Sequence, residues 1–129
     1  MNLKNIIQLV QSILEPRSEI IFAYIFGSAV KSEKPHDIDV AVYLDDPAIL
    51  RQYPLYDIRL SNELEARLGM SVDVVIINTA PDHLIYEISK GKVIINKDDD
   101  FRTDFITLSW KKYFEMAPKR REWFNEATK

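Results

Sequence analysis

Hydrophobic residues recur along this chain at two different spacings, and the two spacings predict helices and strands. In four segments they return every three or four positions, as on the buried face of an amphipathic helix. Between these segments stand short runs of β-branched and aromatic residues, which are typical of buried strands. The predicted helices cover residues 2–14, 55–68, 81–90 and a segment from Asp98 onward, and the predicted strands cover residues 20–26, 38–44, 72–77 and 93–95.

Prolines and glycines mark where the predicted helices end. Pro16 closes the first helix, and Gly69 and Gly91 close the next two. Pro118 is expected to break the last helix, because proline lacks the backbone N–H that a helix interior needs. Residues 119–129 are then expected to form a charged tail.

The order of the predicted elements defines the fold class. Residues 29–31 are expected to form a short helical turn, and residues 45–54 follow neither pattern. Helices and strands otherwise alternate, which indicates an α/β or α+β fold with one small mixed sheet flanked by helices. No internal repeat or linker divides residues 1–129, so we expect a single domain.

Composition narrows the function classes. With 47% hydrophobic and 29% charged residues, the chain has the mix of an ordinary globular protein. It contains no cysteine, which excludes disulfides, thiolate zinc sites and cysteine nucleophiles. The formal net charge of −3 does not favour nucleic acid as a direct partner, since phosphate binding needs a positive field. The longest apolar run, residues 20–26, is too short to cross a bilayer, so we expect a cytoplasmic protein that does not bind membranes.

Two carboxylates at the start of the second strand are the first candidate for chemistry. Because side chains alternate along a strand, Asp37 and Asp39 point to the same face. Paired carboxylates repel each other unless they are protonated or share a cation, and oxygen ligands of this kind suit Mg²⁺ beside a polyphosphate. Asp73 adds a third acid within another hydrophobic strand.

A turn directly after the first strand is the second candidate. Gly27 lacks a Cβ, so the backbone there can approach a ligand closely. Ser28 follows at a predicted helix start, where free N–H groups favour a phosphate. Lys31 and Lys34 lie in the loop that follows, and His36 directly precedes the acid pair; each could contact phosphate or lie on a solvated loop.

These motifs together resemble a known family. Gly27-Ser28, the Asp37-Ile38-Asp39 pair and Asp73 in a later strand are similar to the signature of the DNA polymerase β-type nucleotidyltransferases. The chain's size resembles the minimal nucleotidyltransferases (MNT) of that superfamily, which act as antitoxins to HEPN-domain toxins.

The resemblance implies a role for each of these residues. Gly27 and Ser28 would hold the β- and γ-phosphates of ATP. Asp37 and Asp39 would bind two Mg²⁺ ions, and Asp73 would share the ion at the acceptor and help to remove its proton. The implied reaction transfers AMP to a hydroxyl, that of a tyrosine in the cognate HEPN toxin, and releases pyrophosphate.

Two other functions stay open at this point. The chain could neutralise its toxin by binding alone, or it could adenylylate a small molecule, as aminoglycoside-modifying enzymes do. About thirty residues follow the last predicted strand, which leaves little room for the helical domain that holds an aminoglycoside. The aromatic residues at the C-terminus (Trp110, Tyr113, Phe114, Trp123 and Phe124) fit either core packing or a docking surface for a partner.

Overall fold

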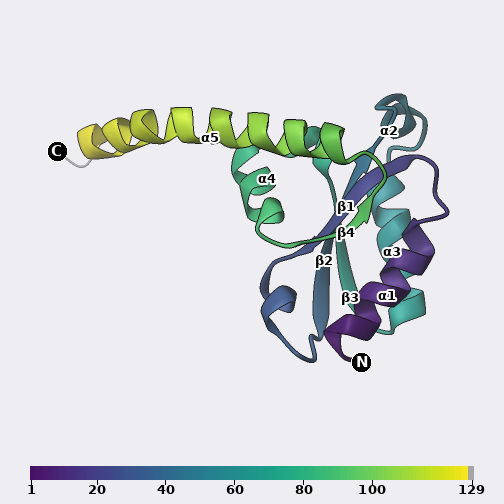
Figure 1. Ribbon diagram of the computed structural model, residues 1–129. Coiled ribbons are helices and arrows are strands. Elements are labelled where there is room, and N and C mark those ends of the chain that lie inside the picture. Colours follow the sequence, from purple (N-terminus) through teal and green to yellow (C-terminus); the bar gives the residue numbers. More distant parts are fainter. Residues whose placement is uncertain (128–129) are drawn as a thin grey trace.

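A four-stranded mixed sheet forms the centre of the protein, as a computed structural model shows (Figure 1). The structure describes the backbone of residues 1–127 and the side chains of residues 1–116. The strands are β1 (Ile20–Phe26), β2 (Asp37–Leu44), β3 (Ser71–Ile76) and β4 (Lys92–Asn96), and they lie in the order β3-β2-β1-β4. β1 pairs antiparallel with β2 and β4, whereas β2 and β3 run parallel. The predicted fold class is therefore confirmed.

Helices cover both faces of this sheet (Figure 1). On one face lie α1 (Leu3–Leu14) and α3 (Tyr56–Leu68), and on the other lie α4 (Asp82–Ser89) and the beginning of α5 (Asp99–Ala127). The remaining elements are short: η1 (Ser28–Lys31), α2 (Ala48–Gln52) and η2 (Ile77–Thr79). Among the described residues, none of the helices is both long and apolar enough to span a membrane.

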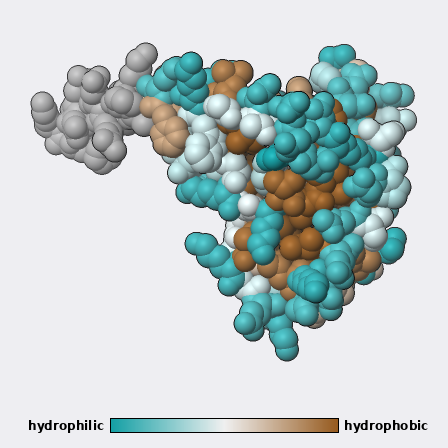
Figure 2. Space-filling model, in the orientation of Figure 1, coloured by the Kyte–Doolittle hydropathy of each residue, from teal (hydrophilic) through white to brown (hydrophobic). Residues whose placement is uncertain are grey.

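Strand alternation gives the sheet two separate hydrophobic layers. Ile38, Val40 and Val42 pack with α1 and α3, whereas Ala41 packs with the α4 layer. Apolar surface removed from water in this way stabilises the fold by about 25 cal/mol per Å². Figure 2 shows hydrophobic residues gathered over the sheet and bordered by hydrophilic ones. Asp37 and Asp39 alternate with Ile38 and Val40, and they therefore share the α4 side of the sheet with Ala41.

Helix α3 also covers the free edge of β3. The Ser61 hydroxyl donates to the carbonyl of Val72, and the Glu65 carboxylate accepts from the Val72 N–H at 3.0 Å. These contacts occupy backbone groups that an edge strand otherwise leaves unpaired. The helix ends at Gly69, which has φ +70° in the left-handed region that favours glycine. Within the predicted helix, Leu55 and Ile58 are exposed and do not face the core.

Helix α5 differs from its prediction. It continues past Pro118 to Ala127 without the expected break, and it extends away from the sheet (Figure 1). A proline removes one backbone hydrogen bond, and the good helix formers on both sides, such as Ala117 before it and Lys119 after it, offset that loss. The expected tail is thus helical as far as Ala127, while the side chains of Trp123 and Phe124 lie outside the described residues.

Hydrogen bonds and aromatic contacts join the first half of α5 to α4. The buried Ser109 donates to Asp82 at 2.7 Å, and the indole N–H of Trp110 donates to Ser89 at 2.7 Å. The ring of Tyr86 contacts the rings of three α5 residues, Trp110, Tyr113 and Phe114. These aromatic residues therefore pack against α4, although half of the Phe114 side chain stays exposed.

Candidate active site

The parallel pairing of β2 with β3 brings the three predicted carboxylates together. In this register Asp39 lies opposite Asp73, and Asp37 lies opposite Ser71. Directly opposed residues of neighbouring strands point to the same face. On the other side of β2, Asp39 is paired with Phe26, which belongs to the α4 layer. All three carboxylates thus lie on the α4 face, at the end of the sheet where β2 and β3 begin.

The carboxylates interact electrostatically. Partial burial raises the pKa of Asp39 above its ordinary value, and the charges of Asp73 and then Asp37 raise it further. Asp37 and Asp73 are exposed. Within the part of the chain that the structure describes, no hydrogen bond or ion pair to any of the three is found. The site therefore gathers negative charge that no described cationic side chain balances.

Gly27 forms the wall opposite Asp39. Its φ of +80° and ψ of −160° lie in a region of backbone conformation that is populated almost only by glycine. A Cβ at this position would stand 2.6 Å from Oδ2 of Asp39. The turn backbone therefore lies directly against the carboxylate, and Ser28 follows as the first residue of η1. A ligand held by Asp39 would meet this turn.

A cavity of about 350 Å³ adjoins the turn on the side of α4. It is lined by residues of the turn and of the α4 C-terminus, namely Gly27, Ser28, Val30, Lys31, Glu87, Lys90 and Gly91. We refer to it as the turn cavity. The end of α4 can come this close because Gly91 has no Cβ; one would stand 2.2 Å from the carbonyl oxygen of Ile25.

Sequence reasoning missed two charged side chains that line the turn cavity, Glu87 of α4 and Lys90 directly after this helix. Lys90 donates to Glu87 at 3.3 Å, which raises the pKa of the Lys90 ammonium, and it lies 4.3 Å from the ring centroid of Tyr86. Glu87 and Lys90 stand three residues apart at the end of a predicted helix, and this spacing alone does not indicate a site. Only the fold brings the end of α4 beside Gly27.

Within the described part of the chain, no hydrogen bond or ion pair joins the three carboxylates to His36, Lys31 or Lys34. His36 is exposed, and no hydrogen bond or ion pair to it is found among the described residues. Lys31 lines the turn cavity, whereas Lys34 does not. Asp98 and Asp99 stabilise the first turn of α5. Asp98 accepts from the Phe101 N–H at 3.0 Å, and Asp99 forms an ion pair with Arg102 at 2.9 Å.

Acids from two neighbouring strands that face a glycine turn are suited to binding phosphate groups through a shared cation, the chemistry of a nucleotide-transferring enzyme. The sequence agrees with this class: residues 8–100 match the family described as polymerase beta, nucleotidyltransferase. Because the match covers well over half of the chain, the protein belongs to this family. No curated protein sequence matches the chain significantly.

Solved structures share the fold over nearly the whole chain. A chain of the MntA–HepT toxin–antitoxin structure aligns with a TM-score of 0.76 at 18% identity, over 98% of this chain and 99% of that chain. A chain of the tri-AMPylated Shewanella oneidensis HEPN toxin in complex with MNT antitoxin gives 0.76 at 19% identity, over 100% of both chains. A toxin–antitoxin structure with AMP-PNP gives 0.77 at 20% identity, over 95% of this chain and 98% of that chain.

Proposed function

We propose that this protein is an antitoxin that transfers AMP from ATP to a hydroxyl of a HEPN-domain toxin. The observation that carries the proposal is the pairing of Asp39 with Asp73 on one face, with Gly27 directly against Asp39. The family supports nucleotidyl transfer. The similar structures support the antitoxin role, since one holds a HEPN toxin that is tri-AMPylated and another holds AMP-PNP.

The donor set fits Mg²⁺. Carboxylate oxygens are the ligands that this ion prefers, and the three acids have no cationic partner among the described side chains. Among the described residues, no three His, Asp or Glu side chains are placed to hold a metal ion by themselves, and this includes the three acids. Mg²⁺ normally completes its shell with waters and substrate phosphates, so an incomplete protein shell suits it. We assign Asp37, Asp39 and Asp73 as the residues that would hold two ions, which would supply positive charge for the phosphates and the acceptor oxygen.

The chain's own residues would bind the phosphates and remove the proton of the acceptor. Gly27 and Ser28 hold the β- and γ-phosphates through the turn backbone and the serine hydroxyl, and the turn cavity gives those phosphates room. The acceptor oxygen attacks the α-phosphorus, and the bond from that phosphorus to the bridging oxygen of the β-phosphate breaks. The electron pair leaves with pyrophosphate, while Asp73 takes the proton of the acceptor hydroxyl. The products are an AMP ester of the acceptor and pyrophosphate.

We assign a tyrosine of the toxin as the acceptor, as the family resemblance implies. ATP is abundant in the cytoplasm, and we expect the reaction to take place there.

Transfer of radiolabel from α-³²P-ATP to the purified toxin tests the proposal. The wild type should label the toxin in the presence of Mg²⁺, and Asp73→Ala should lower the rate by about a thousandfold. Asp45→Ala is the matched control, because Asp45 is an exposed aspartate beyond the other end of β2. Neutralisation of the toxin without any transfer of label would show a binding antitoxin instead. Labelling of an aminoglycoside would show a small-molecule enzyme.

A further inference from the structure

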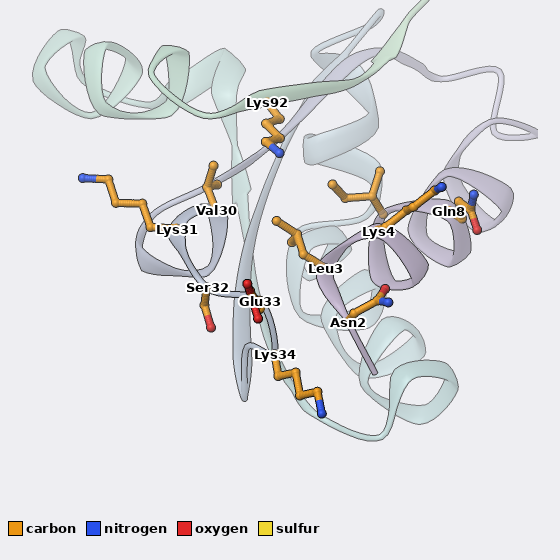
Figure 3. A pocket seen from close by; sticks show the side chains of 11 residues that line it. Asn2, Leu3, Lys4, Gln8, Val30, Lys31, Ser32, Glu33, Lys34 and Lys92 are labelled. Carbon is orange, nitrogen blue, oxygen red and sulfur yellow. The ribbon is translucent and has the colours of Figure 1, made fainter.

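A second and larger cavity lies between the N-terminus of α1 and the loop that follows Gly27 (Figure 3). Its volume is about 740 Å³, within the range of about 300–1,000 Å³ typical of small-ligand sites. Four lysines line it, Lys4, Lys31, Lys34 and Lys92, so we call it the lysine cavity. They come from α1, from the loop and from the start of β4, which the fold alone brings together.

Positive charge is concentrated here on a chain whose net charge is −3. Among the described residues, none of the four lysines forms an ion pair, even though Glu33 also lines the cavity. The N-terminal end of α1 faces the same space and carries no acidic residue in its first turn. The positive end of the helix dipole therefore adds to the charge of the ammonium groups.

The walls of the lysine cavity are apolar as well as basic. Leu3, Ile7 and Val30 line it, together with the side-chain amides of Asn2 and Gln8. Figure 3 shows Lys92 extending from β4 toward the space between the loop and α1, with Lys31 and Lys34 extending outward from the loop. Lysine side chains are flexible, so ammonium groups on the rim can turn toward an anion inside.

This cavity is separate from the candidate active site. Leu3, Ile7 and Val30 pack against the core layer of α1 and α3, whereas Asp39 and Asp73 point to the α4 layer. The two sites adjoin at η1, because Val30 and Lys31 line both the lysine cavity and the turn cavity. A ligand in the lysine cavity would therefore contact the loop that follows Gly27 and Ser28.

We propose that the lysine cavity is a second nucleotide site, which binds phosphate groups through the lysines without a metal ion. The ammonium groups recognise the phosphates, and the positive end of the α1 dipole favours their charge. The apolar side chains contact the base, and the amide of Gln8 and the NH₂ group of Asn2 offer hydrogen bonds to its edge, while the Asn2 Oδ1 caps α1. This combination fits a nucleotide better than inorganic pyrophosphate, which has no apolar part.

Calorimetric titration of the full chain with AMP-PNP tests this site. In EDTA at low ionic strength, the Mg²⁺-dependent site is silent and the lysine cavity should still bind. Lys4→Gln combined with Lys92→Gln should weaken that binding by about tenfold, since two ammonium groups leave the site. Both residues line only the lysine cavity and not the turn cavity. The matched control is Lys111→Gln with Lys112→Gln, which makes the same charge change at exposed positions on α5.

Two further arms decide the assignment. AMP should bind more tightly than inorganic phosphate, which has a similar charge but no base. Inorganic pyrophosphate should bind more weakly than AMP-PNP. Equal affinity for pyrophosphate and AMP-PNP would overturn the nucleotide assignment. Equal weakening in the two double variants would show a general charge effect and overturn the site. Asp39→Asn should keep the binding in EDTA while it loses AMP transfer, so the result stands apart from the proposed enzymatic function.

Discussion

The two faces of strand β2 perform different tasks, although their residues alternate in a single stretch of sequence. Ile38 is only 2% exposed and belongs to the core layer of α1 and α3, while its neighbours Asp37 and Asp39 point to the opposite face. The hydrophobic face stabilises the strand, and the acidic face gathers charges that repel one another. A rigid, well-packed strand is what allows unfavourable charges to be held close together. The two faces should therefore respond differently to substitution.

The largest effect is expected on the acidic face. Asp39→Asn should lower the rate of AMP transfer by about a thousandfold, because the centre of the proposed metal site loses its charge. The same substitution removes a charge that Asp73 and Asp37 oppose, so the melting temperature should stay the same or rise. Transfer assays and thermal denaturation of the same preparation measure both quantities. A variant that transfers AMP at nearly the wild-type rate would contradict the proposed role of Asp39.

The opposite result is expected one residue earlier, on the hydrophobic face. Ile38→Ala should lower the free energy of unfolding by about 3 kcal/mol, because it leaves a cavity in the layer between the sheet and α1 and α3. Far below its melting temperature, this variant should keep most of its transfer activity, since no proposed catalytic group is lost. Urea denaturation and transfer assays at low temperature check the two statements. A loss of activity as large as that of Asp39→Asn would show that the two faces are not independent.

Two glycines with positive φ sharpen the comparison. Gly27→Ala should cost about 2 kcal/mol of stability, from a backbone conformation that alanine avoids, and should also displace the Asp39 carboxylate and lower transfer. Gly69→Ala should cost about 1 kcal/mol and leave transfer unchanged. Gly69 also has positive φ, but a Cβ there would meet nothing within 4 Å. Equal transfer rates in the two variants would show that the contact between Gly27 and Asp39 has no role.

Local patterns in the sequence predict much of this arrangement and miss the rest for physical reasons. Alternation along β2 predicts that Asp37 and Asp39 share a face, because the period of a strand is local. The run of hydrophobic residues around Asp73 predicts a strand, but it does not predict that this strand pairs parallel with β2, because the pairing depends on the connection through α3. In the structure the two strands pair in parallel, with Asp73 opposite Asp39. The roles of these residues in catalysis stay predictions.

The parts of the sites that sequence reasoning missed all depend on contacts between distant segments. Gly91 ends a predicted helix, but only the packed structure shows that it lets α4 approach β1 and form the turn cavity. Lys4 and Lys92 are separated by most of the chain, and each taken alone indicates a solvated surface position. Pro118 shows the reverse case, since a strong local signal for a helix end was outweighed by the residues around it.

The smallest effect concerns the protonation of Asp39. Because burial and then the charges of Asp73 and Asp37 raise its pKa above 3.8, the folded protein holds this proton more tightly than the unfolded chain does. In the absence of Mg²⁺, wild type and Asp39→Asn should therefore have similar melting temperatures well below pH 3.8, where Asp39 is protonated in both the folded and the unfolded wild type. As the pH rises from 3.8 through the raised pKa, the wild type should lose stability relative to the variant, because Asp39 must then ionise where it is partly buried and beside two other acids. Thermal denaturation across this pH range measures the difference, and Mg²⁺ should reduce it at neutral pH by binding only the ionised site. A difference that does not change with pH would mean that neither burial nor the two neighbouring acids raise the pKa of Asp39 in the folded protein, and the acidic face of β2 would then carry no unfavourable charge.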